Sequence, residues 1–218
     1  MPPPWLQTLG AVYVPLSILA ALYVTADIFA FGHRQPMRIM EAVWPLTLLY
    51  WGPLGLVFYF WFGRASHGHK QDAPMWQAAF KGATHCGAGC ALGDFLGDWI
   101  AFASGFALFG SALGGKYALA FALAYLIGIV FQYFSVAPMR GLGLRDGIVA
   151  AIKIDTLSLI AYEVGMFAVM GWRASAHPEL QPTTWTYWLL MQLAMVLGFA
   201  TTYPVNWLLI RRGVKEKM

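Results

Sequence analysis

Long apolar stretches alternate with short polar interruptions along the whole chain. The interruptions collect glycine, proline and charged residues, which favour connections between helices. Each apolar stretch is long enough to cross the hydrocarbon core of a membrane, which takes about 20 helical residues. We therefore predict about six membrane-spanning helices, near Leu9–Phe31, Met40–Phe62, Gly82–Phe109, Tyr117–Val136, Val149–Trp172 and Trp185–Ile210.

The composition supports this prediction. Hydrophobic residues make up 59% of the 218 residues and charged residues only 11%, whereas soluble domains carry roughly 25% charged residues. The mean hydropathy is +0.59, which is typical of an integral membrane protein. We predict one all-α domain over residues 1–218, a polytopic helix bundle surrounded by membrane lipid. The net charge of +4 requires no nucleic-acid partner.

The basic residues predict an orientation. With six spans, both termini lie on the same side of the membrane, and ten of the 14 Lys and Arg residues fall on that side. The other side holds Arg34, Arg38, Lys116 and Arg173. Because cytoplasmic loops carry the excess of Lys and Arg, we expect both termini in the cytoplasm of a multi-pass protein of the cytoplasmic (inner) membrane.

The third predicted span combines small and ionisable residues at helical spacing. Three glycines recur at every fourth position: Gly89, Gly93 and Gly97. Beside them runs a line of thiols and carboxyl groups: Cys86, Cys90, Asp94 and Asp98, with His85 on the adjacent flank. A glycine line lets a second helix approach closely, and ionisable groups inside a membrane mark functional sites. We therefore expect this face to point into the bundle.

The fifth predicted span carries a second polar face. It is formed by Asp155, Leu159, Tyr162, Glu163, Met166 and Met170. If the two spans face each other, Asp155 lies at the depth of Cys86, and Glu163 lies at the depth of Asp94. Such an arrangement would form a polar path across the membrane. The alternatives are that the methionines fill gaps in the core and that Glu163 is a proton carrier or a structural tie.

These side chains suggest metal chemistry. Thiolate and imidazole bind soft or borderline ions, whereas carboxylates suit harder ions or carry protons. We predict a site for Cu(I), or for zinc, from His85, Cys86, Cys90, Asp94, Asp98, Asp155, Glu163, Met166 and Met170. The alternative is a packing helix whose cysteines behave as small apolar residues. His33, near the first connection with Asp27 and Glu41, is a weaker metal candidate, and the alternative is that Asp27 or Glu41 pairs with Arg34 or Arg38. The pair His67 and His69 is another weaker candidate, for which a solvated loop is the alternative.

The run from Thr84 to Asp94 reads Thr-His-Cys-Gly-x-Gly-Cys-x-Leu-Gly-Asp. With this signature the chain resembles an uncharacterised family of small polytopic bacterial membrane proteins, a domain of unknown function. The resemblance implies membership of that family and an integral-membrane fold. It brings no established activity, and no site residue is taken from it.

The leading functional hypothesis is metal-ion handling, most simply copper transport or delivery to a metalloenzyme. An alternative is an accessory subunit of a larger membrane complex that seats a lipid, quinone or pigment, and another is a thiol-quinone redox protein. The chain contains no phosphate-binding loop and no supported Ser-His-Asp motif, so no catalytic residue is assigned and a non-enzymatic role is favoured. A homo-oligomer is compatible with each of these hypotheses.

Overall fold

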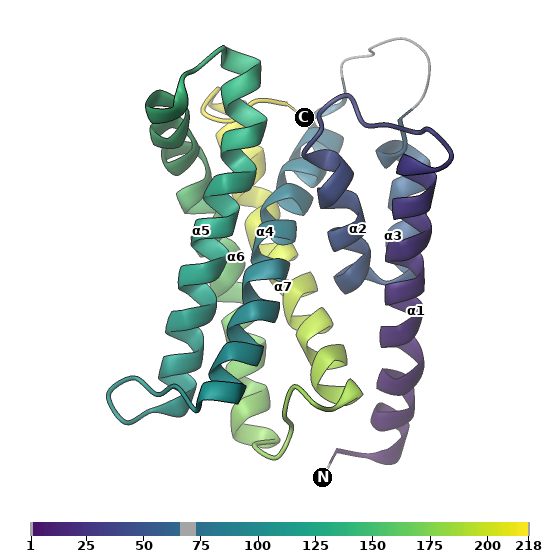
Figure 1. The fold of residues 1–218 in the computed structure, drawn as a ribbon, viewed down its shortest axis with the longest axis vertical. Helices are drawn as coiled ribbons and strands as arrows, with labels where there is room; N and C mark the ends of the chain where they lie inside the picture. The colour runs from purple at the N-terminus through teal and green to yellow at the C-terminus, as the bar shows by residue number, and fades with distance from the viewer. Residues whose placement is uncertain (1, 66–72, 218) are drawn as a thin grey trace.

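The computed structural model describes residues 2–65 and 73–217, and all regular elements within them are helices. This confirms the predicted all-α class. The elements, shown in Figure 1, are α1 (Pro4–Phe29), α2 (Met40–Trp51), α3 (Pro53–Phe58), the π-helical turn η1 (Tyr59–Gly63), α4 (Met75–Ser104), α5 (Ala112–Arg140), α6 (Leu144–Ala176) and α7 (Trp185–Arg211).

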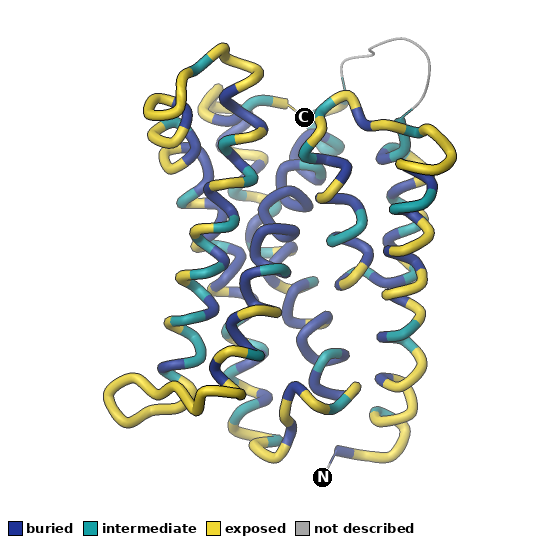
Figure 2. The backbone as a smooth tube through the Cα atoms, in the orientation of Figure 1, coloured by how far each residue is buried: buried dark blue, intermediate teal, exposed yellow. Residues whose placement is uncertain are grey.

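Three helices, α1, α5 and α7, are long and apolar enough to cross a membrane. The helices α4 and α6 are longer still, at 30 and 33 residues, but they carry ionisable side chains. Figure 2 shows that α4 is buried over most of its length, whereas α1 exposes one side along its whole length. The exposed side of α1 is apolar and includes Leu9, Leu16, Leu19 and Leu22. Apolar side chains outside and ionisable ones inside are what a lipid solvent favours.

The predicted span Met40–Phe62 is wrong, because the chain folds back on itself at Gly52. The ring of Trp44 lies 5.5 Å from that of Tyr59, and it packs directly on Gly63. In one continuous helix, Trp44 and Gly63 would lie about 28 Å apart along the axis. Gly52 has φ +59° and ψ −147°, a conformation that favours glycine. Thus α2 enters the bundle and α3 with η1 returns to the same end (Figure 1).

The turn of this hairpin lies inside the bundle, where its backbone groups need partners. The carbonyl of Leu49 accepts a hydrogen bond of 2.6 Å from the Gln192 side chain on α7. The carbonyl of Trp51 accepts one of 2.9 Å from the Tyr13 hydroxyl on α1. Two long helices therefore hold the turn in place.

The base of the hairpin is held by an ion pair to α1. Arg64, directly after η1, donates to both carboxylate oxygens of Asp27, at 2.7 and 2.9 Å. The Tyr59 hydroxyl donates to the same carboxylate at 2.8 Å. His33 lies 3.3 Å from Asp27 and is thus part of this ion-pair cluster.

The hairpin also changes the topology. Because α2 and α3 enter and leave at one end, only α1 and α4 to α7, among the described elements, run the length of the bundle. Five traversing helices bring the two termini to opposite ends of the molecule (Figure 1). The structure therefore contradicts the prediction that both termini lie on one side.

The predicted role of the glycine line is confirmed, and its partner is α5. A Cβ atom on Gly89, Gly93 or Gly97 would lie only 2.3 to 2.9 Å from backbone atoms of α5. The α5 residues at these contacts are also small and also recur at every fourth position: Gly128, Ala124 and Ala120. The two backbones thus meet along several turns, as small residues permit in membrane helices. This contact fixes the rotation of α4, which turns its polar line toward α6 and α7.

Candidate functional site: a chain of buried ionisable side chains

All nine predicted site residues lie inside the bundle. Each is at most 1% exposed, and they come from α4 and α6: His85, Cys86, Cys90, Asp94, Asp98, Asp155, Glu163, Met166 and Met170. These nine side chains therefore form an internal polar column, as the polar faces of the third and fifth predicted spans indicated. For clarity, the end of the bundle that carries the C-terminus is called the tail end, and the opposite end is called the far end.

At the far end, Asp98 has a cationic partner from α5. The Lys116 ammonium lies 3.0 Å from the Asp98 carboxylate. The Tyr187 hydroxyl, from α7, contacts both the carboxylate and the ammonium. The Arg173 guanidinium lies 4.9 Å from the Tyr187 ring centre and donates to the carbonyl of Leu180. Four elements thus converge on one ion-pair cluster.

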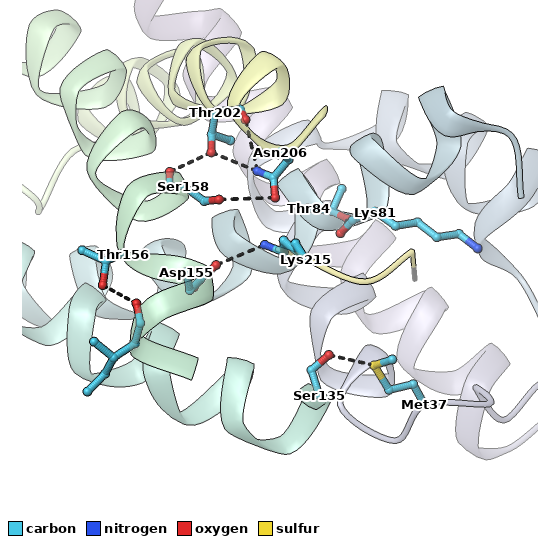
Figure 3. A network of polar contacts seen from close by, with 11 residues as sticks. Met37, Lys81, Thr84, Ser135, Asp155, Thr156, Ser158, Thr202, Asn206 and Lys215 are labelled. Carbon is cyan, nitrogen blue, oxygen red and sulfur yellow. Dashed lines mark hydrogen bonds and ion pairs between the residues drawn. The ribbon is translucent and has the colours of Figure 1, made fainter. Parts of the chain in front are cut away.

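At the tail end, Asp155 is paired with a lysine that follows the last helix. The Lys215 ammonium lies 3.1 Å from Asp155 Oδ1, and both side chains are fully buried. Figure 3 shows Lys215 pointing toward Asp155, next to hydrogen bonds that join α6 to α7. In that neighbouring group, the Thr202 hydroxyl donates to the carbonyl of Ser158 at 2.7 Å. The column is therefore closed by an ion pair at each end.

Between the ends, Asp94 and Glu163 have no such partner. Among the described residues, none of their four carboxyl oxygens has a hydrogen-bond partner, and neither residue forms an ion pair. The two groups are close enough to interact electrostatically, and the Cys90 thiol lies beside Glu163. Two neighbouring carboxyl groups in a dry interior need protons or a cation, because an unpaired buried charge is very costly.

A small cavity lies on the far-end side of this carboxyl pair. Its volume of about 10 Å³ is room for about one water molecule. Its polar lining includes Asp94, Asp98 and Lys116. Three sulfur-bearing side chains also face it: Met166, Met170 and Met191. The methionines of α6 therefore share a cavity with the α4 carboxyl groups.

The predicted ligands do not form one preassembled metal centre. Among residues 2–65 and 73–217, no group of three or more His, Cys, Asp or Glu side chains is close enough to hold a metal ion. Instead, they are spread along the column, and Asp98 and Asp155 are each held by a lysine. Neither ring nitrogen of His85 has a hydrogen-bond partner among these residues. His67 and His69 lie outside the described residues.

Sequence reasoning missed three side chains of the column: Lys116, Tyr187 and Lys215. Each lies at least 60 residues along the chain from a side chain that it contacts. The available signal for Lys116 was a lone lysine directly before the predicted span Tyr117–Val136. The Lys215 side chain lies in a short basic tail, and that pattern is more typical of a solvated segment.

Comparison with known protein families gives one match. The model of the family described as Domain of unknown function (DUF4396) matches residues 75–215. The matched region is more than half of the chain, and it contains the whole column from Asp98 to Lys215. No curated protein and no solved structure matches the chain.

Proposed function

Because the chain belongs to the DUF4396 family, whose matched region contains the entire ionisable column, we propose a function for that column: it takes up a cation within the membrane and passes it between the two ends of the bundle. The observation that supports this proposal is the unpartnered pair Asp94 and Glu163. Ionisable residues at membrane depth are expensive and are typically retained for ion or proton pathways.

The side chains around the pair favour a soft cation. The Cys90 thiol lies beside Glu163, and three methionines line the adjoining cavity with Asp94. Thiolate and thioether ligands select Cu(I), so copper is the proposed cation and zinc is the second choice. The described residues offer no ready group of three ligands. This favours a site that forms only while the cation passes, rather than a permanently bound metal centre.

The ion pairs at the two ends support transport over storage. Lys116 holds Asp98 at the far end, and Lys215 holds Asp155 at the tail end. Each lysine places a positive charge where a cation would enter or leave. An arrangement with an ion pair at each end and carboxyl groups without an ion-pair partner in the middle corresponds to an occluded state of a transporter.

The fold supports a new orientation for the protein. Of the 13 described Lys and Arg residues, 11 lie in the tail half of the bundle. Only Lys116 and Arg173 lie at the far end. By the positive-inside rule, we place the tail end in the cytoplasm and the N-terminus on the other side of the inner membrane. In this arrangement five helices cross the membrane, and the hairpin of α2 and α3 enters it from the cytoplasmic side.

The test uses the purified full-length chain in liposomes. Uptake of Cu(I) and of Zn²⁺ is measured for the unmodified protein, for Glu163→Gln and for Asp94→Asn. Both replacements keep the side-chain shape and remove the group that can ionise, so we expect uptake to fall at least tenfold. Asp146→Asn is the matched control, because Asp146 is an exposed carboxylate on the same helix as Glu163. Unchanged uptake in both column variants would refute the proposal.

Elemental analysis separates copper from protons. Purified protein is compared with the double variant Cys86→Ser, Cys90→Ser for bound copper and zinc. Metal that is lost with the thiols supports the copper proposal. If no metal binds, and Glu163→Gln abolishes proton movement measured with an internal pH dye, the cation is a proton and the copper assignment is wrong.

A further inference from the structure

Lys215 occupies an unusual place for a residue of a C-terminal tail. It lies beyond the end of α7, yet its side chain is fully buried. Lys217, two residues further along, is exposed. A positive φ of +69° at Gly213 turns the chain back, and the Val214 amide then donates to the carbonyl of Leu209 at 2.9 Å. This turn directs the Lys215 side chain into the tail end of the column.

The surroundings of the Lys215 ammonium contain more ligand atoms than the ammonium uses. Asp155 Oδ2 has no hydrogen-bond partner among the described residues, and the same is true of both nitrogens of His85 and both amide atoms of Gln132. All three side chains are at most 1% exposed. His85 is within electrostatic range of Asp155 and Lys215. Gln132 lies one turn from Gly128, where a Cβ atom would be 3.6 Å from Asp155 Oδ2.

An imidazole nitrogen suits a borderline cation such as Zn²⁺, and carboxylate and amide oxygens are common ligands of divalent cations. We propose that Asp155, with His85 and Gln132, is a second cation site, and that the Lys215 ammonium occupies this site as a tethered competitor. A cation that arrives from the Asp94 and Glu163 pair displaces the lysine and leaves at the tail end. This inference rests on the proposed function only for the origin of the cation.

The tail can release Lys215 without unfolding a helix. Besides the ion pair with Asp155, the tail is held by hydrogen bonds from the Val214 and Lys215 amides to the carbonyl of Leu209, at 2.9 and 3.3 Å, and by the neighbouring Arg140–Glu216 ion pair. The Arg140–Glu216 pair lies at the surface, where ion pairs contribute little. Displacement therefore requires a replacement cation for Asp155 and little else.

The first experiment uses the unmodified chain. An amine-reactive acetylating reagent is applied with and without Cu(I) or Zn²⁺, and labelling of each lysine is followed by mass spectrometry. Lys215 should be protected without metal and should react at least tenfold faster with saturating metal. Lys217 is the internal control and should react equally in both. Unchanged protection of Lys215 at saturating Cu(I) and Zn²⁺ would overturn the proposal and leave a structural ion pair.

A binding experiment distinguishes this site from the central pair. At a metal concentration too low to displace the lysine, Lys215→Met should bind one more Cu(I) or Zn²⁺ per chain than the unmodified protein, and Lys217→Met should not. Adding Asp155→Asn to Lys215→Met should remove the extra ion. Adding Glu163→Gln instead should leave it in place, so the tail-end site can be present even where the proposed function fails.

Lys215→Met leaves Asp155 without its partner and should lower the stability of the protein. Thermal unfolding with and without metal therefore provides a second test of the site. Added metal should raise the unfolding temperature of Lys215→Met, because a ligand that binds only the folded state stabilises it. The double variant Lys215→Met, Asp155→Asn should lose the part of this shift that comes from the tail-end site and keep only the part that comes from the central pair. An equal response of the two variants would overturn the assignment of Asp155.

Discussion

Replacing Gly93 with alanine should destabilise the bundle strongly, although alanine is the better helix former. A Cβ atom at this position would lie 2.3 Å from both the Cα and the N atom of Ala124. Carbon atoms pack at about 3.5–4.0 Å, so α4 and α5 would have to separate by about 1 Å or more. The clash is with backbone, so no side-chain rotation relieves it. Overpacking of this kind costs about 3 kcal/mol.

The assay is unfolding in detergent micelles, by heating and by titration with a denaturing detergent, followed by tryptophan fluorescence. For a chain of this size, we expect the unfolding temperature to fall by about 6–12 °C. Gly171→Ala is the matched control, because a Cβ atom there meets only the Tyr117 hydroxyl, at 3.4 Å. That variant should be as stable as the unmodified chain or slightly more stable. Equal stability of the two variants would refute the close approach of α4 and α5.

Three further predictions test the hairpin and the topology. Gly52→Ala should destabilise the protein by about 1–3 kcal/mol, because φ is positive there and a Cβ atom would lie 2.7 Å from the Ser17 hydroxyl. A free energy of unfolding close to that of the unmodified protein would contradict the turn at Gly52. Gln192→Ala should cost about 1–3 kcal/mol, because the Leu49 carbonyl loses its donor, whereas the exposed Gln181→Ala should change little in the same denaturation assay. Tags at the two termini should be accessible from opposite sides of the membrane in a protease-protection assay, and accessibility from one side only would restore the six-span topology.

Local periodicity was sufficient to predict the face of α4. The spacing of Gly89, Gly93 and Gly97 depends only on the geometry of one helix, and it correctly indicated close packing against another backbone. The identity of the partner was not predictable in the same way. Sequence reasoning had to guess which helix lies opposite. The equivalent line of small residues on α5 has one charged neighbour, Lys116, which lies one turn before Ala120 and was counted only as a loop charge.

The hairpin was missed because the hydrophobicity of a segment does not show whether the chain continues through the membrane or turns back. The stretch Met40–Phe62 has 23 residues, which is enough for one membrane crossing. The same apolar residues can equally be buried by two half-length helices that form a hairpin. The signal was the pair Gly52-Pro53 in the middle of the stretch. Proline removes a helical hydrogen bond and glycine permits positive φ, but membrane helices tolerate both. Only contacts such as Trp44 with Gly63 distinguish a hairpin from a kinked span.

The two lysines of the column explain how carboxyl groups can persist in the interior at both ends, and they lead to one further prediction. Breaking a buried ion pair by removing one partner is strongly destabilising, about 3–5 kcal/mol, whereas replacing both partners with neutral groups of similar size is often neutral. Lys116→Met should therefore lower the free energy of unfolding markedly, because Asp98 remains buried beside it without its ammonium. The double variant Lys116→Met, Asp98→Asn should recover most of that stability, since the amide oxygen that replaces the carboxylate still accepts a hydrogen bond from the Tyr187 hydroxyl. If the ion pair serves transport, both variants should lose cation uptake in liposomes although only one of them is unstable. Full uptake by the stable double variant would show that the far-end ion pair has a structural role only.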